Sequence, residues 1–383
     1  MIKIDIPYST QWVDDDDIKA VGKILNSRWI TQGPKIDEFE EKLAKYVGAR
    51  YAIAVSSGTA ALNIACLIGG IGPEDEVIVP TLSFVATSNC VLYCGASPVL
   101  VDVYKDTLTI NVEEVKKKIT KRTKAIIAVD FAGHPAEWHS LAKIAKKSNL
   151  LLIADSAHAL GSIYQGKNVG SIADITTFSF HPVKTITTGE GGAITTDNKV
   201  FAEKARQIRN HGIIKSNSYS KRFGGWYYQI ERLGYNFRIT DFQAALGISQ
   251  LKKIESFIKR RRQIWRRYNE AFSKLEGLIL PIEEEGCFCA WHLYPICIKK
   301  AGARISRRQV YDKLRQLGIG VQVHYLPIHL LSLYKKLLGH KKGDFPVAES
   351  YYDQALSLPL FPSMSNFDQT KVIQSLKSIL NKK

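Results

Sequence analysis

The 383-residue chain contains no apolar run that approaches the roughly 20 residues needed to span a bilayer. Its first residues, MIKIDIPYST, lack the apolar stretch of a secretion signal. We therefore expect a cytoplasmic protein without membrane association. The spacings Cys90–Cys94 and Cys287–Cys289 do not continue into a second Cys or His pair, so we expect no metal site.

Acidic side chains are few relative to basic ones, 36 against 53, which gives a net charge of +17. This excess indicates an anionic partner, either nucleic acid or a phosphorylated small molecule. Much of the charge is dispersed and no DNA-reading motif stands out, so we expect no nucleic-acid partner. A basic nucleic-acid-binding regulator stays as the non-enzyme alternative. The dense run KRRRQIWRR at 259–267 is interpreted as the solvated polar face of a long helix.

Short runs of apolar and β-branched residues alternate with helical patterns over the first three-fifths of the chain. Such continuous strands with intervening helices predict an α/β fold with a large, mostly parallel seven-stranded sheet covered on both faces. The runs span 51–56, 76–80, 97–103, 124–130, 151–155, 174–180 and 192–196.

A long helical segment at 241–275 separates this region from a more mixed remainder. We predict a large α/β domain over residues 1–250 and a smaller α+β domain over residues 251–383. Residues 1–14 are an additional segment that can pack on the smaller domain.

Parallel sheets bind ligands at the carboxyl ends of their strands. In SSGTAAL, Ser57, Gly58 and Thr59 follow one strand and begin a helix, which makes an anion site from backbone N–H groups and hydroxyls. No lysine follows, so the segment is not a nucleotide-binding P-loop and a phosphate monoester fits better. A routine helix cap is the alternative interpretation.

Asp155 ends another strand, and Lys184 follows it in SFHPVKTITTGEGGA. A lysine amine can condense with the aldehyde of pyridoxal 5'-phosphate (PLP), and a carboxylate can keep the pyridine nitrogen of PLP protonated. The same lysine must later act as a neutral amine, which burial and cationic neighbours favour. A turn aspartate or a surface lysine explains each residue alone, but the pair predicts a PLP site.

Other residues near these motifs have chemistry that suits the same cofactor. His158 can donate to the phenolic oxygen of PLP, and Ser179 can add a donor for the phosphate. His181 can bind substrate or assist proton transfer, and Phe84 can stack on the pyridine face. A core aromatic and a polar turn histidine are the plainer interpretations. The loop 215–232 is either a substrate lid or a mobile surface loop.

Taken together, these segments resemble the DegT/DnrJ/EryC1/StrS family of sugar aminotransferases over nearly the whole chain. The most specific matches are SFHPVKTITTGEGGA and GYNFRITDFQAALG. The resemblance implies a fold type I, aspartate aminotransferase-like PLP-dependent transferase that acts on nucleotide-linked keto-sugars. Some relatives replace the lysine with histidine and catalyse dehydration, and Lys184 argues against that reaction here.

The family pattern also implies roles for individual residues. Lys184, Asp155 and His181 are the expected catalytic residues, with Lys184 holding PLP and Asp155 pairing with its ring nitrogen. Asn236 would reach the phosphate from a partner subunit, which implies a homodimer with its active sites at the subunit interface. The expected cofactor-binding residues are Ser57, Gly58, Thr59, Phe84, Asp155, His158, Ser179, Lys184 and Asn236. Many members carry Gln at the position of His158 and some carry Trp at that of Phe84.

A narrower likeness appears in IPYST, LNSRWITQG and VQVHYLPIHLLSLYKK. It points to members that transfer the amino group of L-glutamate to C4 of a UDP-linked 4-keto-6-deoxy-N-acetylhexosamine in pseudaminic acid biosynthesis. Enzymes that make a 4-amino-arabinose, perosamine or bacillosamine-type product are the alternatives. The expected substrate-binding residues are Tyr8, Arg28, Trp29, Ile30, Thr31, Ser57, Ser179, Asn236, Arg238, His324 and Tyr325.

Overall fold

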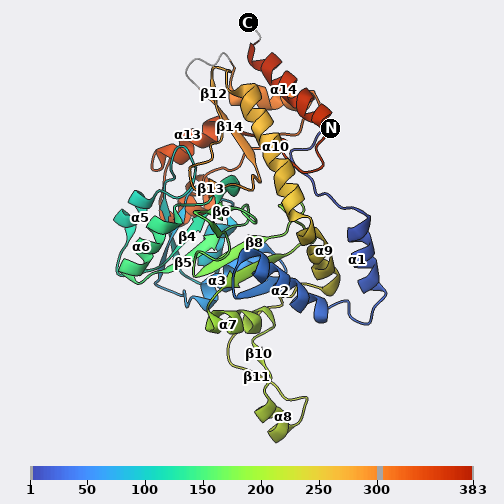
Figure 1. Ribbon diagram of the computed structural model, residues 1–383. Helices are drawn as coiled ribbons and strands as arrows, with labels where there is room; N and C mark the ends of the chain where they lie inside the picture. Colours follow the sequence, from blue (N-terminus) through green and yellow to red (C-terminus); the bar gives the residue numbers. More distant parts are fainter. Residues whose placement is uncertain (1–2, 300–304, 382–383) are drawn as a thin grey trace.

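The computed structural model describes residues 3–299 and 305–381 and is built around one central sheet (Figure 1). The strand order is β1-β9-β8-β5-β4-β2-β3. All pairs among β2, β3, β4, β5 and β8 are parallel, while β9 is antiparallel to both β1 and β8. The predicted mostly parallel seven-stranded sheet is therefore confirmed. The strands are β1 (Tyr51–Val55), β2 (Glu76–Pro80), β3 (Ser97–Val101), β4 (Thr123–Val129), β5 (Leu151–Asp155), β8 (Ile175–Ser179) and β9 (Gly192–Thr196).

Helices cover both faces of this sheet. Successive strand residues point to opposite sides, and the apolar side chains on each side pack against helices. On one face, Ile53 and Val55 of β1 pack with residues of α3 (Gly58–Ile68), α4 (Ala86–Tyr93) and α7 (Lys199–Arg209). On the other face, Ala52 and Ala54 pack with residues of α2 (Pro34–Val47) and α9 (Asp241–Lys252). Towards β3 the same face is covered by α5 (Val112–Lys118) and α6 (Trp138–Ser148). Burial on both faces explains why the strands are apolar without alternation.

The C-terminal part of the chain forms a second, smaller sheet with the order β12-β14-β15. Its strands are β12 (Leu278–Ile279), β14 (Tyr294–Ile298) and β15 (Ala355–Leu358). Helices α10 (Ile254–Phe272), α11 (Arg307–Gln316) and α14 (Asn366–Asn381) contribute to its core. The N-terminal segment runs beside it, since Ile6 bridges Ile319 and Tyr8 accepts a backbone hydrogen bond from Leu360. The domain boundary at residues 250/251 stays a prediction.

Two helices of this C-terminal part pack back onto the central sheet. Helix α12 (Ser332–Leu338) and helix α13 (Pro346–Gln354) contribute Tyr334, Ala348 and Tyr351 to the cluster that also holds α3 and α4. Helix α1 (Asp15–Leu25) lies beside α9. Other short strands are β6 (Ile163–Tyr164), β7 (Lys167–Asn168) and β13 (Cys287–Phe288), and the 3-10 turns are Phe131–Gly133 and Ile328–Leu330.

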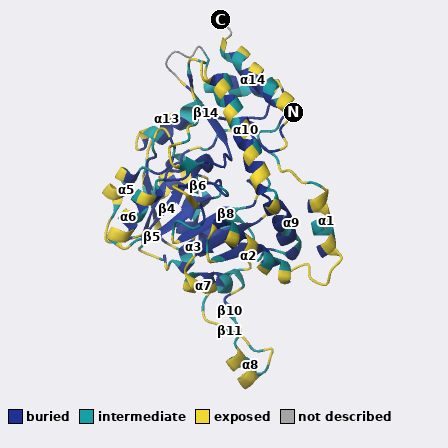
Figure 2. Ribbon diagram, in the orientation of Figure 1, coloured by how far each residue is buried: buried dark blue, intermediate teal, exposed yellow. Residues whose placement is uncertain are grey.

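A narrow arm projects from the body next to α7 (Figure 1). It consists of the paired strands β10 (Ile213–Ile214) and β11 (Gln229–Ile230), with α8 (Asn217–Phe223) at its tip. Figure 2 shows that the tip is largely exposed. Two large apolar side chains at the arm are almost fully exposed, Trp226 at 80% and Leu233 at 82%.

Within the described residues, no helix is long and apolar enough to cross a membrane. The interpretation of 259–267 as a solvated helix face is wrong for two of its arginines. Arg261 is 0% exposed and Arg262 is 9% exposed. Arg262 pairs with Glu283 and donates to the carbonyl of Cys289, so these arginines join α10 to neighbouring segments.

Candidate active site

A cavity of about 330 Å³ opens at the carboxyl ends of β1, β5 and β8. Polar residues that the sequence distributes over distant motifs meet there, as expected for a parallel sheet. Most of the predicted site residues contribute to its wall. These are Tyr8, Ser57, Gly58, Thr59, Phe84, Asp155, His158, Ser179, His181, Lys184, His324 and Tyr325.

The floor at the start of α3 is a cradle built from small residues. Ser57 is the N-cap of this helix, and its hydroxyl accepts from the backbone N–H of Ala60 at 3.1 Å. A Cβ on Gly58 would lie 2.9 Å from the Cβ of Ser179, and one on Gly192 would lie 2.5 Å from the carbonyl of Ser57. Glycine at both positions lets these three segments approach closely. The free N–H groups of a helix N-terminus and the adjacent hydroxyls suit a phosphate.

Asp155 lies at the end of β5 with its carboxylate almost fully buried. Its Oδ2 accepts from the Thr87 hydroxyl at 2.6 Å, and its Oδ1 accepts from the backbone N–H of Ala157 at 3.3 Å. Burial raises the pKa of Asp155, while these hydrogen bonds and the Lys184 amine oppose that rise. The carboxylate is thus arranged to be ionised when a cation faces it.

Lys184 lies in a tight turn between β8 and β9. Its backbone N–H donates to the carbonyl of His181, and the turn closes where Thr188 donates to the carbonyl of Phe180. The residue as a whole is partly exposed, but its amine sits deep enough for desolvation to lower its pKa to about 8. Asp155 raises this pKa and Arg261 lowers it. A substantial neutral fraction of the amine is therefore available near pH 8.

Three histidines surround this lysine and are kept neutral. Burial, assisted by the Lys184 charge, lowers the pKa of His158 and His292 far below the usual range and that of His324 to about 4. The rings of His158 and His292 lie 4.4 Å apart, centre to centre. The Nε2 of His158 lies 3.3 Å from the Tyr325 hydroxyl. Its Nδ1 is buried and has no hydrogen-bond partner among the described residues.

Phe84 and His181 are exposed members of the wall, as is Glu190. Phe84 is 56% exposed, and its ring centre lies 5.9 Å from that of Tyr325. An exposed aromatic at the rim has a free face for stacking on a planar ring. His181 is exposed at the start of the lysine turn.

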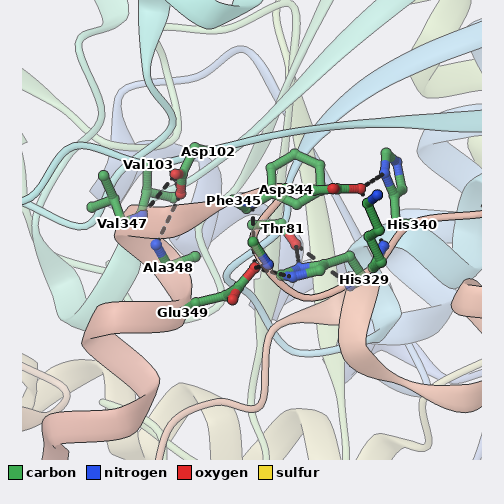
Figure 3. Close-up of polar contacts among 12 residues, drawn as sticks. Thr81, Asp102, Val103, His329, His340, Asp344, Phe345, Val347, Ala348 and Glu349 are labelled. Atoms are coloured by element: carbon green, nitrogen blue, oxygen red, sulfur yellow. Dashed lines mark hydrogen bonds and ion pairs between the residues drawn. The ribbon is translucent and has the colours of Figure 1, made fainter.

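His329, which follows His324 and Tyr325 in the chain, makes buried polar contacts with Thr81 and Glu349 (Figure 3). His329 Nδ1 lies 2.7 Å from the Thr81 hydroxyl, and its Nε2 lies 3.0 Å from the carboxylate of Glu349. Thr81 immediately follows β2, so this chain of contacts joins the helix α13 to the cavity side of the sheet.

A second anchor holds the start of the same helix (Figure 3). The Asp102 carboxylate accepts from the backbone N–H groups of Val347 and Ala348, both at 2.9 Å. A carboxylate at a helix N-terminus satisfies free donors and is favoured by the helix dipole. Both anchors hold the C-terminal wall of the cavity against the central sheet.

Six of the predicted residues do not line the cavity of their own chain. Residues 28–31 lie in the link between α1 and α2, where Thr31 bridges Thr240. Asn236 bridges Asn210, whose side-chain oxygen accepts from Arg238 at 2.7 Å. The six residues are Arg28, Trp29, Ile30, Thr31, Asn236 and Arg238.

Sequence reasoning missed several polar residues of the site. Ser83 and His292 line the cavity, and Thr87 holds Asp155 from behind. Ser83 and Thr87 stand in PTLSFVAT on either side of Phe84, so the motif contained a signal for them. Arg261 contacts the Lys184 carbonyl from α10, and its place in a basic run gave no such signal.

These features fit PLP. The cradle of Ser57, Gly58 and Ser179 would suit its phosphate, Lys184 would offer an amine of lowered pKa to its aldehyde, and Asp155 would offer a buried carboxylate to its ring nitrogen. The unpartnered Nδ1 of His158 is a buried polar atom for which a ligand oxygen would supply a partner.

Known proteins resemble this chain over nearly its full length. Over 98% of this chain, it is 40% identical to the spore coat polysaccharide biosynthesis protein SpsC of Bacillus subtilis, covering 97% of that protein. It is 39% identical to the UDP-4-amino-4,6-dideoxy-N-acetyl-β-L-altrosamine transaminase of Campylobacter jejuni, covering 98% of each chain. The solved structure of the sugar aminotransferase Spr1654 from Streptococcus pneumoniae, in its pyridoxamine phosphate (PMP) form, superposes with a TM-score of 0.93. The two sequences are 32% identical, and the match covers 98% of this chain and 99% of that one.

The model of the DegT/DnrJ/EryC1/StrS aminotransferase family matches residues 11–377. That match spans the cradle, the lysine turn and the C-terminal wall of the cavity. The chain therefore belongs to the DegT/DnrJ/EryC1/StrS family of PLP-dependent aminotransferases.

Proposed function

We propose that this enzyme transfers the amino group of L-glutamate to C4 of UDP-2-acetamido-2,6-dideoxy-β-L-arabino-hex-4-ulose. The product would be UDP-4-amino-4,6-dideoxy-N-acetyl-β-L-altrosamine, in pseudaminic acid biosynthesis. The observation that carries the transamination chemistry is the pairing of Lys184 with the buried Asp155 in one cavity. Support for the sugar comes from the full-length likeness to the Campylobacter jejuni transaminase and from Tyr8, His324 and Tyr325 on the cavity wall.

PLP, when bound, supplies an electron sink for the bond that breaks at the amino-bearing carbon. Lys184 would hold the cofactor and, once displaced, take the proton from the α-carbon of glutamate. In the second half-reaction it would move a proton at C4 of the sugar. Both tasks need a neutral amine, and its lowered pKa of about 8 supports this role.

Asp155 would keep the ring nitrogen protonated throughout, with Thr87 and the N–H of Ala157 holding its carboxylate in place. His158 would donate to the ring oxygen, and Phe84 would stack on the ring. His181, at the rim of the cavity, would bind substrate or assist proton transfer. The neutral state of His158, His292 and His324 supports a pocket for an uncharged sugar ring.

We also propose a homodimer with active sites at the subunit interface. The cavity wall carries no arginine among the described residues, so the diphosphate of a UDP-sugar needs cations from elsewhere. Arg28, Arg238 and Asn236 lie outside the cavity of their own chain and would reach the site of a partner. The exposed Trp226 and Leu233 of the arm support such an interface, because large exposed apolar side chains commonly mark contacts. No residue of 215–232 lines its own cavity, so a lid role would also act on the partner.

A second candidate is another nucleotide-sugar 4-aminotransferase of the family, making a 4-amino-arabinose, perosamine or bacillosamine-type product. The observation that favours it is the 40% sequence identity to SpsC of Bacillus subtilis. This value is as high as the 39% identity to the altrosamine transaminase of Campylobacter jejuni. Related 4-keto sugars differ at single stereocentres, and overall identity does not discriminate between them.

The test is incubation of the purified protein with PLP, L-glutamate and a panel of UDP-4-keto sugars. Products would be identified by mass spectrometry and NMR. We expect a C4 amine on the β-L-arabino-hex-4-ulose and formation of 2-oxoglutarate. Preferred turnover of a different keto-sugar would favour the second candidate, and no amine transfer to any sugar would contradict both.

A further inference from the structure

Arg261 is a fully buried cation next to the lysine turn. It lies in the middle of α10 and is 0% exposed. Its Nη1 donates to the carbonyl of Leu360 at 3.1 Å and approaches the carbonyls of His292 at 3.3 Å and Trp291 at 3.5 Å. Its Nη2 approaches the Lys184 carbonyl at 3.4 Å. The contact to Leu360 has ordinary hydrogen-bond length, and the three longer contacts surround the guanidinium with carbonyl dipoles.

No carboxylate of the described residues pairs with this guanidinium although it is fully buried, and this combination separates Arg261 from the other arginines of the run. Arg262 is paired with Glu283, and the more exposed Arg260 donates to the Met364 carbonyl and the Asn366 side chain. Desolvation lowers the pKa of Arg261 to about 10, so it is still charged at neutral pH. A buried charge without a counter-ion is costly, and packing alone does not require one at this position.

We propose that Arg261 is a positioning residue for Lys184: it fixes the main chain of the lysine turn to the 291–292 segment and to Leu360, and it keeps a permanent positive charge at the main chain of Lys184. One residue thereby ties together the turn that carries Lys184, the segment that carries His292 and the segment after β15. The inference rests on the proposed role of Lys184 as the lysine that holds the cofactor.

The charge has a defined effect on the lysine. A nearby cation disfavours the ammonium form, so Arg261 lowers the pKa of Lys184 in the same direction as burial does. Asp155 opposes both effects. His158, His292 and His324 also interact with the lysine, and all three are neutral near pH 7. Four further titratable residues line the same cavity, Tyr8, His181, Glu190 and Tyr325. Among the groups that interact with the amine, Arg261 is thus the fixed positive charge.

The experiment measures capture of PLP by the cofactor-free, full-length protein over a range of pH. Borohydride fixes the captured cofactor, and peptide mass spectrometry quantifies the adduct on Lys184, so catalytic turnover is not the readout. Capture needs the neutral amine, and its pH midpoint therefore reports the protonation of Lys184. The variants are Arg261→Gln, which removes the charge, and Arg261→Lys, which keeps the charge but loses the planar fork of donors. Arg260→Gln on the same helix is the matched control.

We expect Arg261→Gln to shift the capture midpoint upward by roughly 0.5 to 1 pH unit. Arg261→Lys should keep the midpoint but capture PLP about 3- to 10-fold more slowly, because a single ammonium cannot hold carbonyls on three segments. Arg260→Gln should match the wild type in both respects. An unchanged midpoint in a folded Arg261→Gln protein would overturn the proposal.

If Arg261→Gln does not fold, Arg261→Lys tests the proposal instead. A PLP capture rate equal to that of the wild type in Arg261→Lys would overturn the proposal. A different failure would concern the proposed function instead. A wild-type adduct on another residue would remove Lys184 from the cofactor role, whatever the arginine variants do.

Discussion

The hydroxyl of Thr87 donates a 2.6 Å hydrogen bond to the buried carboxylate of Asp155. Thr87 lies in α4, and its own oxygen is 2.6 Å from the hydroxyl of Ser83, which lines the cavity. Two hydroxyls thus connect the cavity wall to the carboxylate that is assigned to the ring nitrogen. The arrangement orients the carboxylate and favours its charged form against the effect of burial.

Replacing Thr87 with Val should weaken both cofactor binding and turnover. The β-branched shape is kept, but the carboxylate loses a charge-assisted hydrogen bond of about 1.5–3 kcal/mol, which corresponds to roughly 10- to 100-fold. Thr87→Ser keeps the hydroxyl and should stay within a few-fold of wild type. The measurements are the dissociation constant for PLP by fluorescence titration and kcat with glutamate. Equal PLP affinity in the Val and Ser variants would refute this role.

Replacing Lys184 with Ala should abolish the cofactor adduct while leaving the fold intact. The side chain lines a cavity and forms no side-chain hydrogen bond with another residue that the structure describes, so the circular dichroism spectrum should not change. Turnover should fall at least about 10³-fold, since both proton transfers lose their base. Mass spectrometry after borohydride treatment checks the adduct, and Lys199→Ala on the exposed start of α7 is the control. An adduct that persists in the Lys184 variant would move the cofactor to another amine.

The strands of the central sheet could be predicted well because their signal is local. The run EVIVP was predicted at 76–80, and β2 spans Glu76–Pro80. Burial on both faces makes such strands continuously apolar, so they stand out from amphipathic helices. The antiparallel direction of β9 was not predicted, because a buried strand carries no pattern that reveals the direction of its neighbours.

The residues that line the cavity could be predicted where they stand in compact motifs at strand ends. Asp155 and Lys184 could be singled out as candidates because their chemistry is unusual for their surroundings, and both line the cavity. Thr87 was missed because threonine is an ordinary helix residue, and its role depends on a contact across 68 positions. Arg261 was misread because a buried arginine in a basic run cannot be told from the exposed residues of that run, such as Lys259 and Arg266. The roles of both residues depend on their tertiary surroundings, and the sequence pattern does not reveal these.

Replacing Gly192 with Ala should disturb the phosphate cradle more than it disturbs the sheet. The added Cβ would meet the backbone of Ser57 and Gly58 at 2.5–2.6 Å, and backbone atoms cannot rotate away. The N-terminus of α3 must therefore shift, which we expect to weaken PLP binding at least about 10-fold. Gly189→Ala is a poorer control because of its left-handed backbone, so Gly22→Ala in α1, where the space is open, serves better. Unchanged PLP affinity in the Gly192 variant would show that the cradle does not bind the cofactor.

Replacing Asp130 with Asn should flatten the pH dependence of stability. Asp130 is fully buried, and its backbone N–H donates to the carbonyl of Asp155. Its carboxylate accepts hydrogen bonds from the Ser156 hydroxyl, the Trp138 indole N–H and the backbone N–H of Ala136. Burial is the main cause that raises its pKa to about 7. Between about pH 4 and pH 7 the folded state therefore holds a proton that the unfolded state has lost, and stability falls as pH rises through this window.

The Asn side chain is uncharged and can accept from Trp138 and Ala136 while its amide group faces Ser156. The variant should gain stability relative to wild type as pH rises, by up to about 2–4 kcal/mol at pH 8 compared with pH 5. Urea unfolding of the cofactor-free proteins at both pH values measures this difference. Because Lys184 and the histidines titrate in both proteins, their contributions cancel in the comparison. Parallel stability curves for the two proteins would mean that Asp130 stays ionised in the folded state across this range.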